Sequence, residues 1–226
     1  DPYKIWLSEI ILQQTRVVQG TSYYLKFINE FPTVKDLSES SEQKILSLWQ
    51  GLGYYSRARN LHAAAKEIIK NNEGVFPSNY NDLLKLKGVG PYTAAAISSF
   101  SFNEAKAVVD GNVFRVLSRI YDISTPINSS QGVKDFQELA QSILNKSDPA
   151  THNQAIMEFG ALVCTPKAPK CKKCPMTLEC SSFKNDTIKM RPVKIRKGTV
   201  RSRFFIYKVF YNSPEKLLFL KKRKAK

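Results

Sequence analysis

The chain has 226 residues, of which 42% are hydrophobic, and a formal net charge of +16. This length is enough for one sizeable core or two smaller ones without disulfides. No run is apolar enough to span a membrane and no basic and apolar leader opens the sequence, so we expect a soluble cytoplasmic protein and no membrane partner. The chain begins inside an amphipathic pattern without an initiator methionine, which indicates a fragment.

The positive charge is concentrated near the end of the chain. Residues 1–183 hold 20 Lys and Arg against 17 Asp and Glu, whereas residues 184–226 hold 15 against 2. Such a tail is typical of a nucleic-acid-binding arm, a solvated linker or part of a domain whose acidic partner is absent. It gives only mild support to a polyanionic partner.

The first predicted helix spans residues 3–18 and is apolar on nearly every side. Glu9 lies within this pattern, on the same face as Gln13, so its carboxyl group should be partly desolvated. Desolvation raises the pKa of a carboxyl group toward the range that is useful for a general acid. The spacing alone is equally compatible with Glu9 on a narrow polar strip.

A glycine-rich turn with adjacent aromatic residues, GLGYYSRARN, follows at 51–60. An exposed tyrosine beside arginine, as with Tyr54 and Arg57, suits DNA because the ring can wedge into the base stack while a guanidinium group meets phosphate. The alternative is a pair of core tyrosines before a solvated helix start. The other helices predicted before residue 80 lie at 22–31, from 40–42 onward and at 61–71.

The hexapeptide LKGVGP at 86–91 joins two predicted helices. Gly88 and Gly90 flank Val89, and Pro91 stands where a helix would begin. A turn of this kind directs backbone N–H groups outward at a helix N-terminus, where they can bind a phosphate oxygen. Two glycines alone more often mark an ordinary turn between helices.

Asp110 ends an apolar run, in the sequence VVDGN, directly before another predicted helix. This position suits a catalytic carboxylate, although an isolated aspartate here is usually a helix N-cap. Strand-like alternation is absent before residue 200, so residues 1–183 are predicted to be all-α. The remaining helices are expected at 81–86, 91–100, 112–121, 133–145 and 152–163.

All four cysteines lie in one segment, with the spacing Cys164-x6-Cys171-x2-Cys174-x5-Cys180. Four thiolates this close can enclose one metal centre, whereas disulfides are rare inside cells. Zinc sites usually come as two separated pairs of ligands, so this spacing is unusual for zinc without excluding it. Four lysines among the ligands would make the loop a cationic patch for phosphates: Lys167, Lys170, Lys172 and Lys173.

These motifs together resemble a known family. LKGVGPYTA, followed about twenty residues later by VVDGNV, resembles the helix-hairpin-helix, Gly-Pro and Asp signature of the DNA glycosylase superfamily. WLSEIILQQT at 6–15 and GLGYYSRARNLH at 51–62 are similar to MutY-type adenine DNA glycosylases. The cysteine spacing resembles the 4Fe-4S cluster loop of endonuclease III and MutY. The resemblance is strong over residues 1–183 and weak beyond them.

The resemblance implies an all-α fold in which two helical subdomains flank a DNA-binding cleft. The implied domains are a six-helix, helix-hairpin-helix subdomain at 1–103, an iron-sulfur cluster subdomain at 104–183, a basic linker at 184–200 and the incomplete beginning of a Nudix-like domain at 201–226. Two strands are expected in the last of these, at 203–211 and 216–220.

The implied function is that of a monomeric, monofunctional glycosylase of base excision repair, in a bacterium associated with the nucleoid. It would flip and release adenine mispaired with 8-oxoguanine or guanine in double-stranded DNA. Glu9 would protonate the base, Asp110 would stabilise the charge on the sugar, and Tyr92 and Asn112 would orient them. Tyr92 stands where bifunctional relatives carry a nucleophilic lysine. DNA contacts are expected from Gln13, Gln14, Tyr54, Arg57, Gly88, Val89 and Gly90, an adenine pocket from Trp6 and Leu12, and 4Fe-4S ligands from Cys164, Cys171, Cys174 and Cys180.

Two alternatives stay open. The chain could be an endonuclease III-like glycosylase of damaged pyrimidines, or a non-catalytic iron-sulfur module that only binds DNA or senses redox state. The presence of both Glu9 and Asp110, each within its family motif, favours an enzyme.

Overall fold

The computed structural model describes residues 1–195, 207–212, 214–215 and 217–222. The chain divides into two compact units, Asp1–Lys194 and Ile195–Lys226. Across the described residues, none of the helices is long and apolar enough to cross a membrane.

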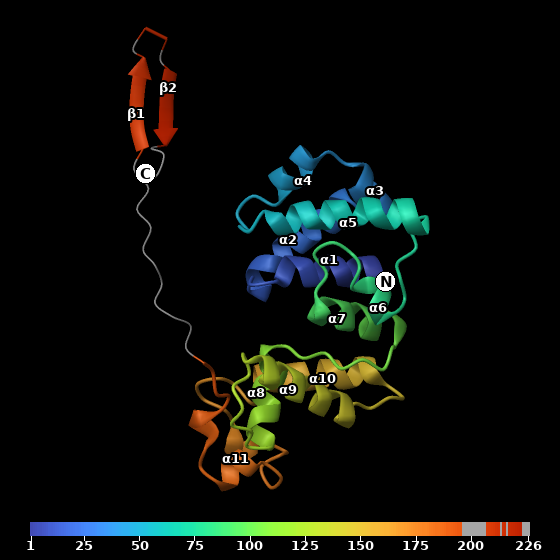
Figure 1. Cartoon of the computed structure of the whole chain (residues 1–226), viewed down its shortest axis with the longest axis vertical. Coiled ribbons are helices and arrows are strands. Elements are labelled where there is room, and N and C mark those ends of the chain that lie inside the picture. The colour runs from blue at the N-terminus through green and yellow to red at the C-terminus, as the bar shows by residue number, and fades with distance from the viewer. Residues whose placement is uncertain (196–206, 213, 216, 223–226) are drawn as a thin grey trace. The chain divides into compact units, whose positions relative to one another are not determined.

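The first unit contains helices and no strand in its described part, so the all-α prediction is confirmed. Two groups of helices are visible in Figure 1. The first group comprises α1 (Pro2–Leu12), α2 (Val17–Glu30), α3 (Val34–Glu39), α4 (Glu42–Leu48), α5 (Ser56–Asn72), α6 (Tyr80–Leu83) and α7 (Pro91–Phe102). The second comprises α8 (Gly111–Ile120), α9 (Ser130–Ile143), α10 (Pro149–Leu162), η1 (Cys171–Lys173), α11 (Ser181–Lys184) and η2 (Ile188–Met190).

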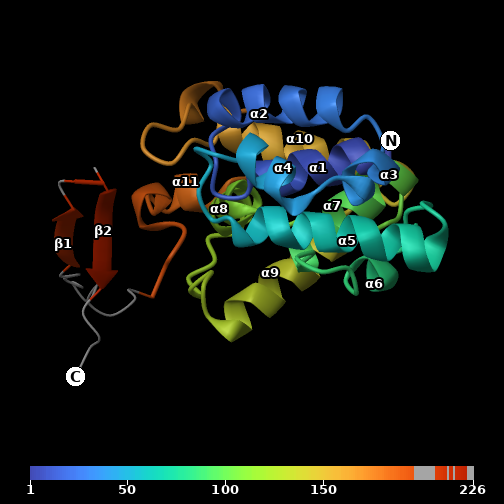
Figure 2. The same ribbon diagram turned by 90° about the horizontal axis from the view of Figure 1, so that it is seen from above.

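Each group has its own hydrophobic core. In the first, Trp6, Phe27 and Trp49 are fully buried, and α3 and α4 pack on the long α5, which Figure 2 shows from above. In the second, Phe136 and Leu117 lie at the centre. Burial of aromatic and branched side chains supplies most of the driving force for folding at both centres.

The predicted helix at residues 3–18 is wrong in its extent, because it is two helices. Helix α1 ends at Leu12, and α2 begins at Val17. Between them Gln14 adopts a left-handed backbone with φ 56°. The apolar pattern runs through this break, because Val17 continues the hydrophobic periodicity although its side chain is 67% exposed.

The segment joining the two groups is extended, and amide side chains hold it. Buried Asn153 of α10 donates to the Ser99 hydroxyl (2.8 Å) and to the Lys106 carbonyl (2.9 Å), and accepts from the Val108 N–H (3.0 Å). Gln141 of α9 likewise accepts from the Ala107 N–H at 3.0 Å. These hydrogen bonds satisfy buried backbone groups that no helix or sheet pairs, and they hold the segment that leads to Asp110.

The second unit shows an antiparallel hairpin of β1 (Tyr207–Asn212) and β2 (Leu217–Lys222). Its register pairs Tyr207 with Lys222 and Asn212 with Leu217. Strands were expected at 203–211 and 216–220, so the pair is confirmed with shifted bounds, although 203–206 and 216 lie outside the described residues. A two-stranded hairpin by itself is marginally stable in water.

Candidate active site and cysteine loop

A cleft of about 850 Å³ lies between α1, α7 and the start of α8. Glu9 comes from α1, Tyr92 from the first turn of α7, and Asp110 and Asn112 from the start of α8. The structure therefore brings together all four residues that were expected to do chemistry. The rest of the lining includes Lys4, Ile5, Ser8, Leu12, Gln13, Thr15, Val17, Tyr24, Phe100, Gln154 and Met157.

Glu9 is half-buried in the wall of the cleft. Burial raises the pKa of its carboxyl group, a hydrogen bond from Tyr92 partly opposes this, and the negative charge of Asp110 raises it further. Burial and the neighbouring Glu9 charge also raise the pKa of Tyr92, so its hydroxyl remains a donor to Glu9. The result is a carboxyl group that can hold a proton inside the cleft.

At Asp110, three N–H groups point at the carboxylate oxygens. Its Oδ1 accepts from the backbone N–H groups of Asn112 and Val113, both at 2.8 Å, and its Oδ2 accepts from the Asn112 side chain at 2.7 Å. An acceptor-only pattern is that of an ionised carboxylate. Asp110 is thus the N-cap of α8 and a cleft carboxylate at once, so both sequence interpretations apply.

Arg115, which the sequence analysis missed, lies one turn after Asn112 and is only 8% exposed. Its guanidinium group donates to Asn112 Oδ1 and to the carbonyls of Gly160 and Cys164, each at 2.7 Å. Periodicity gave no signal for it, because Arg115 lies opposite the apolar positions Val113, Val116 and Leu117 of α8. Arg115 therefore connects the neighbour of Asp110 to the start of the cysteine loop.

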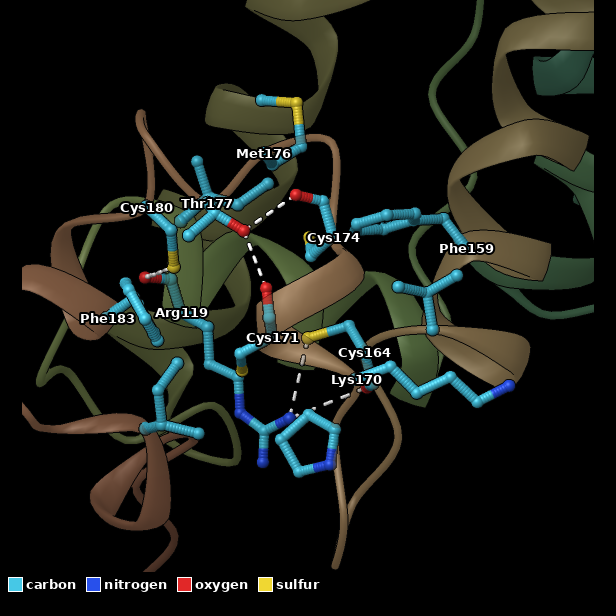
Figure 3. Close-up of a pocket in the computed structure, with 14 residues that line it drawn as sticks. Arg119, Phe159, Cys164, Lys170, Cys171, Cys174, Met176, Thr177, Cys180 and Phe183 are labelled. Atoms are coloured by element: carbon cyan, nitrogen blue, oxygen red, sulfur yellow. Dashed lines mark hydrogen bonds between the residues drawn. The ribbon is translucent and has the colours of Figure 1, made fainter.

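Cys164, Cys171, Cys174 and Cys180 border one cavity beside α8 (Figure 3). Arg119 donates to the Cys164 sulfur (3.4 Å) and to the Thr165 carbonyl (2.8 Å). The Thr177 hydroxyl lies 2.6 Å from the carbonyls of Cys171 and Cys174, which closes the loop around the thiols.

The four cysteine thiols are compatible with a 4Fe-4S cluster. In the described part of the chain, no three His, Cys, Asp or Glu side chains are arranged to hold a single metal ion, yet the four thiols share one cavity. Burial and the charges of the other cysteines raise the pKa of the Cys171 thiol. Thiolates that crowd together in this way need positive charge between them.

Three residues expected to touch DNA or substrate are placed otherwise. Trp6 is fully buried and packs edge-on against Phe76, so its assignment to the adenine pocket is wrong, whereas Leu12 does line the cleft. The Val89 side chain is 7% exposed in the core and its N–H donates to Leu86, which leaves no group for phosphate.

Arg57 is the third. Instead of pointing into solvent toward phosphate, its guanidinium group donates to backbone carbonyls of Ile10, Ile11 and Gln13. The reason is that α1 ends beside it, and the last carbonyls of a helix lack internal partners.

The other expected DNA contacts are exposed or half-exposed. Gln14 and Tyr54 have left-handed backbones, and the Tyr54 side chain is 67% exposed. Gly88 has φ 81°, and a Cβ atom there would stand 2.7 Å from Cβ of Asn60. Gly90 caps α7 ahead of Pro91, as the Gly-Pro motif predicted. Gln13 lines the cleft and its amide lies 3.4 Å from the Thr93 hydroxyl.

Comparison with known proteins decides the family. A model described as "HhH-GPD superfamily base excision DNA repair protein" matches residues 7–145. The chain belongs to this superfamily. The match runs from α1 through α9 and includes Glu9, the glycine hairpin and Asp110.

Proteins that are similar to this chain in sequence include adenine DNA glycosylases. The chain is 44% identical to that of Buchnera aphidicola subsp. Baizongia pistaciae over 83% of its own length and 53% of the relative's. It is 42% identical to the human enzyme over 79% of its length and 33% of the relative's. The chain thus spans about half or less of these two relatives.

Solved structures of other DNA-acting proteins show the same fold. A thermostable thymine-DNA glycosylase superposes with a TM-score of 0.75 and 32% identity, covering 82% of this chain and 85% of that one. An endonuclease III in a non-covalent DNA complex superposes with a TM-score of 0.72 and 22% identity, covering 83% and 86%.

Proposed function

We propose that this chain carries the active site of a monofunctional DNA glycosylase, which hydrolyses the N-glycosidic bond of adenine paired with 8-oxoguanine or guanine. The observation that carries the proposal is the pair Glu9 and Asp110, which line one cleft in opposite hydrogen-bonding environments. Two carboxyl groups kept in different protonation states are the requirement for glycosidic hydrolysis. The identity to adenine DNA glycosylases supports the choice of base.

The chemistry follows from the two environments. The adenine is extruded from the duplex because its glycosidic bond is out of reach within the stack. Protonated Glu9 gives its proton to N7 of the purine, so the C–N bond breaks with its electron pair leaving on a neutral base. Ionised Asp110 stabilises the positive sugar until water adds to its anomeric carbon, and the Glu9 carboxylate then takes the proton that the water loses. Tyr92 holds the Glu9 carboxyl group, and Asn112 holds Asp110.

Strand cleavage is not expected. Tyr92 occupies the position of the lysine nucleophile in bifunctional relatives, and a phenol cannot form a Schiff base. Lys4 is the lysine that lines the cleft among the described residues. Its side chain is 53% exposed and its ammonium group pairs with Asp1 at 3.6 Å, so Lys4 lacks the burial that would activate it as a nucleophile.

DNA contact is proposed for the exposed loops next to the cleft. Gln14 and Tyr54 would fill the space left by the base, and the hairpin would hold a phosphate. Within the described residues, the N–H groups of Gly88 and Gly90 have no hydrogen-bond partner, which leaves them for an anion at the start of α7.

We further propose that the four cysteines hold a 4Fe-4S cluster. Hydrolysis transfers no electron, so the cluster would act by fixing the fold of the loop and its lysines near phosphate. Arg119 and Thr177 would shape the loop around it. Analysis of the purified protein should find iron and sulfide in equal amounts, near four of each per chain. One zinc per chain without sulfide would contradict this part.

The experiment that tests the function is single-turnover base release from four duplexes, followed by alkali. They carry adenine opposite 8-oxoguanine, adenine opposite thymine, thymine opposite guanine, and thymine glycol. We expect alkali-dependent breaks at the mispaired adenine alone. Breaks without alkali at thymine glycol would favour an endonuclease III-like enzyme, and release of mispaired thymine would follow the thymine-DNA glycosylase relative. Tight binding without release would favour a binding module.

A further inference from the structure

We propose that Arg57 is a positioning residue, which fixes two exposed turns, 13–15 and 52–54, so that Gln14 and Tyr54 meet DNA as one unit. This inference rests on the proposed function, since it is that function that brings both side chains onto DNA. Arg57 itself does not touch substrate in this account; it acts through the two turns.

A single guanidinium group reaches both turns. Its Nη1 donates to the carbonyls of Ile10 (3.0 Å), Ile11 (3.0 Å) and Gln13 (2.6 Å) at the end of α1. Its Nη2 points to the carbonyls of Leu52 and Gly53 at 3.4 and 3.5 Å, which are longer contacts. The first set is therefore the stronger anchor, and the second ties the other turn to it.

Aromatic rings add to the contacts of Arg57 with the turn at 52–54, where its hydrogen bonds are long. We call Arg57 with its carbonyl partners in both turns the Arg57 clamp. The guanidinium carbon of Arg57 lies 5.1 Å from the ring centre of Trp49 and 5.9 Å from that of Tyr54. Trp49 in turn donates its indole N–H to the Gly53 carbonyl at 3.0 Å. The turn before α5 is thus held from both sides, and Tyr54 itself packs over the clamp.

Gln14 and Tyr54, at the tips of the two turns, have backbone conformations that need support from neighbouring residues. Gln14 has φ 56° and Tyr54 has φ 48°, in the left-handed region that residues with a side chain rarely adopt. Strained backbone of this kind persists only where surrounding contacts over-determine it. Both residues are solvent-exposed, so the support comes from beneath, and Arg57 is the side chain that contacts both turns.

The guanidinium group of Arg57 suits this bridging role better than the ammonium group of lysine would. Planar guanidinium presents five N–H donors in a fixed fork, so it can serve acceptors on two sides at once, whereas ammonium is a compact charge on a flexible stem. The carbonyls at the end of α1 also carry the negative end of the helix dipole, which favours a cation there. Lysine at this position would keep the charge and lose the bridge.

The test uses Arg57→Lys and Arg57→Met, with Arg59→Met as the matched control. Arg59 lies in the same turn of α5, but its side chain is 55% exposed and pairs with Glu42 on the surface. The duplex carries a stable abasic-site analogue opposite 8-oxoguanine, with 2-aminopurine beside the lesion. Insertion of Gln14 and Tyr54 into the duplex would unstack 2-aminopurine and increase its fluorescence. The fluorescence therefore reports on the position of these two side chains rather than on folding.

We expect both Arg57 variants to lose most of the fluorescence change and to release adenine about tenfold more slowly at saturating protein. The salt dependence of binding to undamaged duplex should stay as in the wild type, and Arg59→Met should resemble the wild type in fluorescence and rate. The proposal would be overturned if the Arg57 variants bound all duplexes equally more weakly and the slope of log affinity against log salt concentration fell by about one. That result would show that Arg57 contacts a phosphate.

A double-mutant cycle covers the case in which Arg57→Met fails to fold. In a Gln14→Ala, Tyr54→Ala background, Arg57→Lys should add little to the loss of the fluorescence change, because Arg57 acts through those residues. Full additivity would overturn the proposal. If the wild type released no base from any duplex, the proposed function would fail, while the fluorescence and the cycle would still decide the role of Arg57.

Discussion

Gly160 of α10 lies directly against Asn112 of α8, since a Cβ atom at residue 160 would stand 2.7 Å from Cβ of Asn112. The backbone oxygen of Asn112 would be 3.1 Å away, so a side chain at 160 must push the two helices apart. Asn112 in turn donates to Asp110 at 2.7 Å. The fit of two helices therefore determines where the cleft carboxylate stands.

We predict that Gly160→Ala destabilises the fold by about 1–3 kcal/mol through overpacking. It should also slow base release, because the Asn112 donor to Asp110 is displaced. Denaturant unfolding and single-turnover rates measure the two effects. Ala161→Ser, on the exposed side of the same helix turn, serves as the control and should change stability by less than about 0.5 kcal/mol. Unchanged stability and rate in Gly160→Ala would refute the packing argument.

Glu9 gives a prediction about pH. Burial raises its folded pKa above the ordinary value of 4.5, so the folded state binds the proton more tightly than the unfolded state. The wild type should then lose stability relative to Glu9→Gln as pH rises from 4.5 through the raised folded pKa, by about 1.4 kcal/mol for each pKa unit of the increase. Thermal unfolding of both proteins across this range measures the difference. A constant difference would show that Glu9 is well hydrated.

Arg115 should matter for both the carboxylate and the cysteine loop. Arg115→Met leaves the buried acceptors at Asn112, Gly160 and Cys164 without their donor, which should cost about 2–4 kcal/mol. We also expect slower base release and lower metal content. Arg16→Met removes an exposed arginine and is the control. Wild-type rate and metal content in Arg115→Met would mean that the bonds are incidental.

Asp122 at the end of α8 should stabilise the segment after the cysteine loop. Hydrogen bonds from Asn185, Thr187 and Ser182, together with the Arg191 guanidinium at 2.9 Å, lower its pKa to about 2 from 3.8. A carboxyl group with a lowered folded pKa stabilises above its unfolded pKa and loses this effect as pH falls. Asp122→Asn should therefore melt several degrees lower at neutral pH, and the gap should close between pH 3.8 and 2.

The control for Asp122 is Glu138→Gln, which removes an exposed acid whose Lys134 partner is 3.9 Å away. Surface pairs of this kind contribute little, so its melting temperature should stay close to that of the wild type at every pH. If the melting temperature of Asp122→Asn stayed below that of the wild type at the lowest pH, the loss would come from altered packing or hydrogen bonding rather than from the lost charge.

Most of the candidate site was predictable because its signals are local in sequence. The Gly-Pro hairpin, Asp110 before a helix and four closely spaced cysteines each concern a few neighbouring residues. Tyr92 followed from the family resemblance, because bifunctional relatives carry a lysine two residues after the glycine that corresponds to Gly90. The expectation that Glu9 faces the cleft, where the structure places it, depended on the family resemblance, because periodicity left its face undecided.

The errors concern long-range contacts. Arg57 donates a hydrogen bond to the Gln13 carbonyl at the break after α1, although the two residues are 44 positions apart. The sequence near Gln14 therefore gives no signal for the break. Trp6 belongs to an apolar face that meets Phe76 rather than the cleft. Arg115 and Asn153 are buried polar residues whose partners come from other elements, and such partners are set by tertiary packing.

We propose that Glu9 and Asp110 act together in one cleft. Single-turnover adenine release from the 8-oxoguanine mispair tests it with Glu9→Gln and Asp110→Asn, since glutamine matches glutamate in shape and asparagine can still cap α8. Binding to the abasic-analogue duplex is measured alongside. We predict that each variant binds within a few-fold of the wild type and releases adenine at least about a hundredfold more slowly. A wild-type rate in either variant would show that the substituted carboxyl group does not take part in the reaction.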